Sequence, residues 1–261
     1  MEVVIQPGAE QIAVLVADAI ERLLAEKPDA VLGLATGSSP LAVYDELVRR
    51  HEAGRISFAR ARAFMLDEYV GLGAEHPELY RNVIEREIAG RVDFAPGAVQ
   101  GPDGLAADLP GACAAYEQAI VDAGGIDLQI LGIGTDGHIA FNEPGSSLAS
   151  RTRIKTLTTQ TRKDNARFFD DDVDAVPQHC LTQGLGTIME ARHLVLVATG
   201  EGKAEAVRQL AEGPVSAMWP ATIMQHHRHA TVLLDDASAS RLERASYYRE
   251  TYATKPEWQS I

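Results

Sequence analysis

The stretch from Leu131 to Pro144, LGIGTDGHIAFNEP, places one imidazole between two carboxylates. An apolar run ends in glycines, and Asp136, His138 and Glu143 then follow within eight positions. Apolar strands that end in flexible polar turns are where α/β proteins present reactive groups. A histidine flanked by carboxylates is held in one tautomer and can accept and release a proton near neutral pH. The segment predicts acid/base chemistry, against the alternative of a structural histidine beside two solvated acids.

The same letters satisfy G-x-G-x-x-G through Gly132, Gly134 and Gly137, the spacing that cradles a dinucleotide pyrophosphate. A dinucleotide site needs a helix that begins within the glycine loop, and Pro144 ends any helix soon after it begins. No strand-ending acid follows at about twenty residues, where the ribose ligand is expected. The context disfavours a nicotinamide cofactor.

A second chemical feature is the segment VLGLATGSSPLAVYDEL, in which Gly37, Ser38 and Ser39 separate an apolar run from a helix that we expect to open at Pro40. Free backbone N–H groups at a helix start, together with the helix dipole, favour an anion, and small residues let it approach. The segment predicts a phosphate site. The simpler alternative is N-capping of the helix by Ser39.

Paired acids follow another apolar run, in ARAFMLDEYVGLG, where Asp67 and Glu68 come directly after the strand. A buried carboxylate at this edge of a sheet can act as a general base, and strand alternation sends its neighbour to the other side. We assign Asp67 as the candidate base. A solvated turn is the alternative.

Two basic residues are candidates for a phosphate contact. Arg167 lies among aromatics in TRKDNARFFDDD, and Lys203 follows the strand HLVLVATG at the opening of a helix. For such runs a solvated charged face is the common alternative. The histidines at 226, 227 and 229 lack zinc spacing, and the aspartates at 170–172 and 174 lack the EF-hand pattern, so no metal site is expected.

The chain as a whole alternates short apolar runs with amphipathic helical patterns, which predicts an α/β fold with a doubly wound, mostly parallel sheet flanked by helices. Its 261 residues and 46% hydrophobic content suit a single domain over 1–261. A net charge of −13 disfavours a nucleic-acid partner, and no leader or membrane span is recognisable, so a cytoplasmic protein is expected.

Cys113 and Cys180 are predicted to be packed thiols. The expected strands are 3–5, 30–34, 62–66, 126–133, 193–198 and 231–234, and the expected helices include 40–53, 109–123 and 203–211.

Taken together, four segments closely resemble the glucosamine-6-phosphate deaminase family: MLDEYVGL, GIGTDGHIAFNEPGSSLASRTRIKTLT, ARFFDDDVDAVPQHCLT and TGEGKAEAV. The resemblance spans nearly the whole chain. It implies the phosphosugar isomerase-like, Rossmann-like fold, and an aldose–ketose isomerisation of glucosamine 6-phosphate coupled to loss of ammonia, with fructose 6-phosphate as product. It also implies that no metal or organic cofactor takes part.

The resemblance further implies residue roles. Asp67 would move the C2 proton to C1, and His138 would open the sugar ring, with Asp136 and Glu143 orienting its imidazole. The cradle at 37–39, with Arg167 and Lys203, would hold the 6-phosphate. Some family members bind N-acetylglucosamine 6-phosphate as an activator at a subunit interface, so the resemblance implies a homo-oligomer, with a hexamer among the known assemblies. The matching activator residues would be Ser146, Arg153, Lys155, Thr156 and Tyr247.

Two other functions are compatible with parts of the sequence. A 6-phosphogluconolactonase-like hydrolase shares the fold and the phosphate handling but needs no carbon base at Asp67. A phosphosugar-sensing module of a transcription regulator would need a DNA-binding segment, and none is recognisable before Val3.

Overall fold

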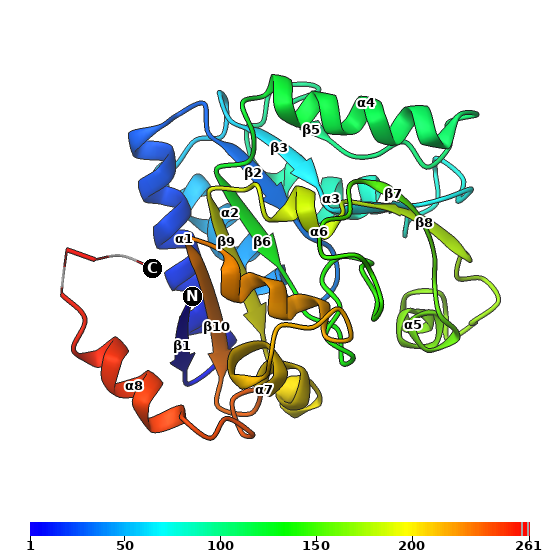
Figure 1. Ribbon diagram of the computed structural model, residues 1–261. Helices are drawn as coiled ribbons and strands as arrows, with labels where there is room; N and C mark the ends of the chain where they lie inside the picture. The colour runs from blue at the N-terminus through cyan, green and yellow to red at the C-terminus, as the bar shows by residue number, and fades with distance from the viewer. Residues whose placement is uncertain (257, 260) are drawn as a thin grey trace.

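The central element is a parallel sheet of seven strands in the order β1-β10-β9-β6-β2-β3-β5 (Figure 1). The computed structural model describes residues 1–256, 258–259 and 261. Continuous apolar runs form these strands, as expected for a parallel sheet that is covered on both faces. The strands are β1 (Glu2–Gln6), β2 (Val31–Leu34), β3 (Arg62–Met65), β5 (Val99–Gln100), β6 (Leu128–Leu131), β9 (His193–Ala198) and β10 (Ala230–Asp235).

The order of the strands shows where the winding changes direction. From β2 the chain proceeds through β3 to β5 on one side, whereas β6, β9 and β10 follow on the other. Neighbouring β2 and β6 are therefore a topological switch point, at which the loops after the two strands diverge and leave a crevice. The predicted phosphate segment follows β2, and the Asp136–His138 segment follows β6.

Helices lie on both sides of this sheet, as Figure 1 shows for α2 behind it and α7 in front. The expected strands and helices are confirmed to within about two residues at each end. The alternative interpretation of the phosphate segment, N-capping by Ser39, is wrong, because α2 begins at Leu41 with Pro40 as its N-cap and no side chain caps it. The α-helices are α1 (Ala9–Glu26), α2 (Leu41–Glu52), α3 (Tyr80–Glu87), α4 (Leu109–Asp122), α5 (Thr159–Asn165), α6 (Leu185–Ile188), α7 (Ala204–Glu212) and α8 (Ala245–Ala253). The 3₁₀ helices are η1 (Ala89–Arg91), η2 (Ala166–Phe168), η3 (Glu201–Lys203) and η4 (Pro220–His226).

A second, antiparallel sheet of three strands stands beside the first, in the order β4-β8-β7. Its strands are β4 (Asp67–Tyr69), β8 (His179–Thr182) and β7 (Arg153–Thr156). This sheet was not predicted from the sequence, which placed Asp67 at the end of the preceding strand, whereas Asp67 is the first residue of β4. The partners are far apart in the sequence, with Asp67 opposite Thr182, and strands of three or four residues carry too little periodicity to be recognised.

The buried apolar residues form two clusters, a large and a small one. The large cluster contains residues from Val3 to Ile261 and fills both faces of the large sheet. A smaller cluster under α5 gathers Tyr69, Phe141 and Phe169 with Cys180. Cys113 and Cys180 are buried and unpaired, which confirms both as packed thiols. Within the described residues, no helix combines the length and apolar character needed to cross a membrane.

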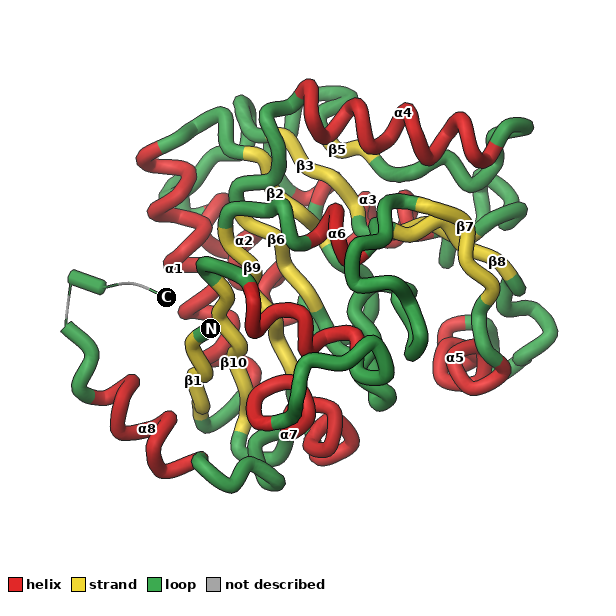
Figure 2. The backbone as a smooth tube through the Cα atoms, in the orientation of Figure 1, coloured by secondary structure: helices red, strands yellow, loops and turns green. Residues whose placement is uncertain are grey.

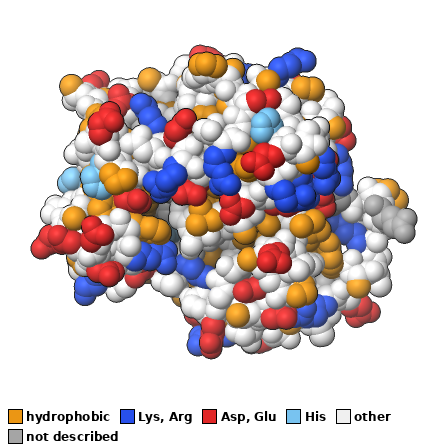
Figure 3. Space-filling model, turned by 180° about the vertical axis from the view of Figure 1, so that it is seen from behind, with side chains coloured by type: hydrophobic (Ala, Val, Ile, Leu, Met, Phe, Trp, Pro, Cys, Tyr) orange, Lys and Arg blue, Asp and Glu red, His pale blue; other side chains and the backbone are white. Residues whose placement is uncertain are grey.

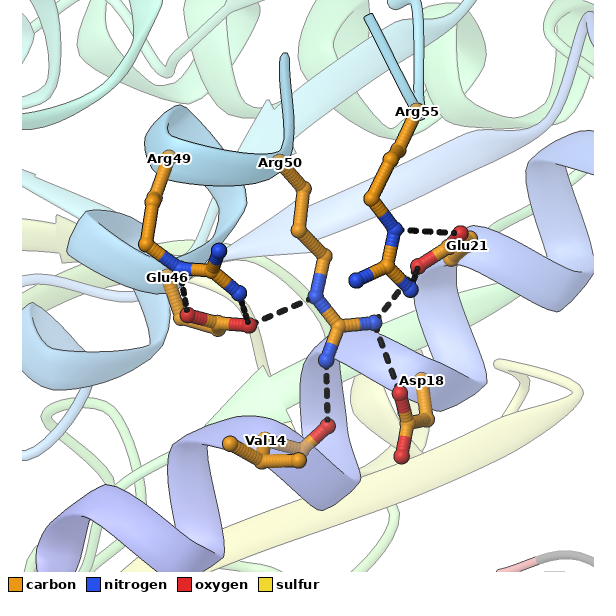
Figure 4. A network of polar contacts seen from close by, with 7 residues as sticks. All are labelled: Val14, Asp18, Glu21, Glu46, Arg49, Arg50 and Arg55. Carbon is orange, nitrogen blue, oxygen red and sulfur yellow. Dashed lines mark hydrogen bonds and ion pairs between the residues drawn. The ribbon is translucent and has the colours of Figure 1, made fainter. Parts of the chain in front are cut away.

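A buried arginine joins α1 to α2 (Figure 4). Only 2% of the Arg50 side chain is exposed, and its guanidinium donates to Glu46 at 2.7 Å, Asp18 at 2.7 Å and Glu21 at 2.6 Å. A further N–H donates to the carbonyl of Val14 at 3.2 Å. The partners satisfy the buried charge, so this network fixes α2, and with it the loop that precedes α2, against α1.

Replacing Arg50 with alanine should lower the stability by about 2–4 kcal/mol, because Glu46 loses its buried partner while Asp18 and Glu21 stay partly in water. For a domain of this size the melting temperature should fall by roughly 5–10 °C in calorimetry. Arg49→Ala is the matched control, because Arg49 is exposed and shares Glu46 with Arg50. Equal melting temperatures for the two variants would contradict the structural role of Arg50.

Candidate active site

A cavity of about 230 Å³ opens at the carboxyl ends of β2 and β6, and side chains from both sheets line it. The structure therefore places the candidate base, the candidate histidine and all the candidate phosphate residues around one space. Its lining includes Gly37, Ser38, Ser39, Asp67, His138, Arg167 and Lys203.

The anion end of this cavity combines a helix start with two cations. Gly37 has a φ of +88°, which lets the chain turn sharply from β2 towards α2. Burial lowers the pKa of Lys203, and the neighbouring charge of Arg167 lowers it further. Two like charges this close repel each other unless an anion lies between them, so they favour a doubly charged group such as phosphate beside the N–H groups of the α2 start.

Asp67 is the candidate base, and the residue is only 6% exposed. Among the described residues no donor or cation offsets its burial. Burial, with a smaller contribution from the charge of Glu68, raises its pKa well above the usual aspartate value. A raised pKa suits a general base that works near neutral pH. Asp67 is among the residues that line the cavity, so this candidate base is accessible to a small ligand.

The side chain of Glu68 points to the opposite side of β4 from that of Asp67, as the alternation of side chains along a strand predicts. Its carboxylate accepts hydrogen bonds from the backbone N–H groups of Tyr69, Tyr80 and Arg81 at 2.8, 2.8 and 2.9 Å. These bonds tie the start of α3 to β4. Glu68 is thus a structural group, whereas Asp67 is left for chemistry.

His138 lies across the same cavity and pairs with Asp136. The Nδ1 atom of His138 is 2.7 Å from Asp136 Oδ1, which also accepts from the His138 backbone N–H at 3.2 Å. Burial opposes the charge of Asp136, but the contacts with His138 prevail and lower the pKa of the carboxyl. A Cβ at position 134 would lie 2.2 Å from the imidazole, so Gly134 makes room for His138. Of the three glycines in the G-x-G-x-x-G spacing, Gly134 is therefore the one that accommodates His138.

Glu143 does not orient His138 in this structure, although the resemblance implied that role. Its buried carboxylate accepts from the Thr158 backbone N–H at 3.1 Å and from the Thr161 hydroxyl at 2.5 Å. Among the described residues it makes no hydrogen bond to His138. The carboxylate instead holds the first turn of α5, whose residues line the cavity.

The five candidate activator residues lie in two separate regions of this chain. Arg153, Lys155 and Thr156 are on β7, and Ser146 is buried nearby in sequence with a hydroxyl that has no partner among the described residues. Tyr247 is on α8, at the opposite side of the molecule from β7 (Figure 2). A single copy of the chain therefore does not bring all five together.

The histidine cluster at 226–229 and the aspartate cluster at 170–174 contain residues with structural roles. His227 contacts the carbonyls of His229 and Ala191 at 2.7 and 2.8 Å, and Asp170 and Asp171 form a turn with positive φ. In the part of the chain that the structure describes, no three His, Cys, Asp or Glu side chains are arranged to hold a metal ion.

Sequence reasoning missed the wall of the cavity that α3 and α5 supply. Tyr80 stacks on Phe141 with ring centroids 6.1 Å apart, and its hydroxyl donates to the Tyr69 hydroxyl at 3.3 Å. Arg86 and Asn165 also line the cavity. Tyr80 and Arg86 stand in no motif that the sequence shows, and Phe141 and Asn165 lie in recognised segments without a pattern that marks them as cavity wall.

The fold and the cavity define a class of α/β enzyme that handles an anionic small molecule by acid/base chemistry. The chain belongs to the family of glucosamine-6-phosphate isomerases and 6-phosphogluconolactonases, whose model matches residues 6–233.

Comparison with individual proteins refines this assignment. The chain is 75% identical to the glucosamine-6-phosphate deaminase of Mycolicibacterium smegmatis and 74% identical to that of Beutenbergia cavernae, in each case over all of both chains. A solved structure of a monomeric glucosamine-6-phosphate deaminase is 41% identical, with a TM-score of 0.90 over 92% of this chain and 99% of that one. The 6-phosphogluconolactonase of Trypanosoma cruzi, at 19% identity and a TM-score of 0.75 over 93% of this chain and 97% of that one, shares the fold.

Replacing Asp67 with asparagine should stabilise the protein, and more so as the pH rises. Below about pH 4 the carboxyl is protonated in the folded and the unfolded chain. Above that pH the unfolded chain loses the proton while the folded chain resists ionisation, because the pKa of Asp67 is raised, so the wild type loses stability with rising pH. We expect the melting temperature of Asp67→Asn to exceed that of the wild type by about 2–4 °C at pH 8 and to equal it near pH 4.

The exposed Asp29 provides the control, and Asp29→Asn should show no such pH-dependent gain. A difference for Asp67→Asn that shrinks as the pH rises would show that this carboxyl is stabilised, and not penalised, by its surroundings.

Proposed function

We propose that this chain converts glucosamine 6-phosphate and water into fructose 6-phosphate and ammonia, as part of amino-sugar catabolism. The observation that supports this most strongly is the buried carboxyl of Asp67, which has no partner among the described residues and lines the same cavity as His138 and the phosphate cradle. The high identity to relatives named as this deaminase, over their full length, supports the same substrate.

The phosphate cradle would fix the substrate at its C6 end. The backbone N–H groups at 37–39 and the charges of Arg167 and Lys203 favour the phosphate dianion. Fixing this end extends the sugar chain along the cavity towards Asp67 and His138, which makes the later proton transfers intramolecular.

His138 would act first, because the closed sugar has no carbonyl to acidify the C2 proton. The protonated imidazole gives its proton to the ring oxygen, the bond between C1 and this oxygen breaks, and the imidazole takes up the proton that the C1 hydroxyl loses, so that the open-chain aldehyde forms. Asp136 holds the imidazole in one orientation through Nδ1, which leaves Nε2 for the sugar.

Asp67 would then act on the open chain. Its carboxylate takes the proton from C2 and returns a proton to C1, so that an enol-type intermediate rearranges and C2 becomes an imine. Water adds to the imine, the C2–N bond breaks, and ammonia leaves with a ketone at C2. A carboxylate with a raised pKa and no competing partner fits both halves of this transfer.

The direct test is ammonia release from glucosamine 6-phosphate by the purified chain. We expect stoichiometric ammonia and fructose 6-phosphate from the wild type. Asp67→Asn should still bind fructose 6-phosphate but lose at least about 10³-fold in rate, because general base catalysis is removed. Exchange of the C2 proton with deuterated solvent should be lost in parallel. Hydrolysis of 6-phosphogluconolactone without ammonia release would instead favour the lactonase alternative, which is supported by the shared fold and by a family that includes 6-phosphogluconolactonases.

His138→Gln should affect the cyclic substrate most, since the side chain keeps polar atoms but loses the acid/base function. We expect the rate with freshly dissolved cyclic glucosamine 6-phosphate to fall by about 10²-fold or more. Exchange on fructose 6-phosphate that is already in its open form should fall much less. Rapid-mixing kinetics separates the two. Equal losses on both forms would exclude His138 from ring opening.

Regulation, assembly and location form a separate part of the proposal. We infer a cytoplasmic homo-oligomer activated by N-acetylglucosamine 6-phosphate, on the family resemblance and on β7, which is paired on one side only and exposes Ile154. The solved relative at 41% identity is described as monomeric, which favours the contrary outcome. Light scattering with and without this ligand decides between an oligomer and a monomer.

No nucleic acid partner is proposed, because the net charge is −13 and acidic and basic side chains are intermixed on the face shown in Figure 3.

A further inference from the structure

The short helix α5 is held at its two ends by the two chain segments that carry the acid/base groups. At its start, Glu143 accepts from Thr158 and Thr161, and Glu143 belongs to the loop that presents His138. At its end, the side-chain amide of Asn165 donates to the Tyr69 hydroxyl at 3.0 Å, and Tyr69 lies two positions after Asp67 on β4. Helix α5 thus bridges the two segments.

The same helix leads directly into η2, which carries Arg167. Isolated helices of seven residues do not persist in water, so the position of α5 depends on its contacts. The carboxylate of Glu143 satisfies a free N–H in the first turn and complements the positive end of the helix dipole. The position of Arg167 therefore depends on what holds Glu143 to this turn.

Thr161 makes the shortest of these bonds. Its hydroxyl is buried, donates to Glu143 at 2.5 Å and lies 3.0 Å from the Thr158 hydroxyl, and the residue also lines the cavity. Without this hydroxyl the buried carboxylate keeps only the Thr158 N–H, and an under-satisfied buried carboxylate is costly. The helix start would then shift or the carboxylate would turn away.

We propose that Thr161 is a positioning residue for the phosphate end of the site: its hydroxyl, bonded to Glu143, fixes the helix that places Arg167. Phosphate binding at Arg167 is thereby coupled to the loop that holds His138. The inference rests on the proposed function for the identity of the substrate, but the phosphate contact itself is tested without it.

The experiment compares Thr161→Val, which keeps the shape and removes the hydroxyl, with Thr161→Ser, which keeps the hydroxyl. Titration calorimetry with inorganic phosphate is the primary measurement. We expect Thr161→Val to bind phosphate about 10-fold more weakly and to raise KM for glucosamine 6-phosphate by a similar factor, with kcat reduced less than about 3-fold. Thr161→Ser should stay within about 2-fold of the wild type. Wild-type affinity in Thr161→Val overturns the inference.

A double-mutant cycle separates positioning from general damage. If Thr161 acts through Arg167, adding Thr161→Val to Arg167→Ala should not weaken phosphate binding further. Additive losses overturn the proposal. Should Thr161→Val fail to fold, Tyr69→Phe removes the contact at the other end of α5 and should weaken phosphate binding in the same way, and unchanged affinity there counts equally against it.

Failure of the proposed function gives a different pattern. In that case the wild type releases no ammonia from glucosamine 6-phosphate, whatever the phosphate affinities of the Thr161 variants. A wild type that releases ammonia and a Thr161→Val variant with unchanged phosphate affinity and KM would leave the proposed function standing and remove this inference alone.

Discussion

Parallel strands share their carboxyl edge, and this constraint underlies the whole site. Because the winding changes direction between β2 and β6, the loops after these strands diverge and leave space for a ligand. The phosphate cradle follows β2, the histidine follows β6, and Asp67 follows β3. Three segments that are far apart in the sequence therefore line one cavity in the folded chain.

The smaller antiparallel sheet adds what the large sheet lacks. It carries Asp67 to the wall of the cavity, and it packs on the apolar cluster of Tyr69, Phe141 and Phe169, of which Phe141 also lines the cavity. Asp67 is buried and has no partner among the described residues, which keeps its pKa high, whereas three backbone N–H groups hold Glu68 in place next to it. Two adjacent acids thus differ in role because alternation along β4 gives them opposite surroundings.

The sequence predicted the features that depend on local pattern. Apolar runs identified the parallel strands. The polar residues that follow these runs, namely the 37–39 cradle, Asp67, His138 and Lys203, were predicted to lie at the carboxyl edge of the sheet. It did not predict the β4-β8-β7 sheet or the wall formed by Tyr80 and Asn165, because these depend on pairings between distant short segments. The binding of Glu143 to Thr161 escaped for the same reason: nearness to His138 in sequence suggested one partner, and folding supplied another.

The most direct test of the account is a structure of the chain with an open-chain amino-alditol 6-phosphate, which resembles the opened sugar but cannot enolise. The account predicts that its phosphate contacts the N–H groups at 37–39 and the side chains of Arg167 and Lys203. Its C2 atom should then lie within contact of the Asp67 carboxyl. A phosphate bound elsewhere, or a carbon chain that extends away from Asp67, would contradict the central claim that one cavity joins anion binding to carbon acid chemistry.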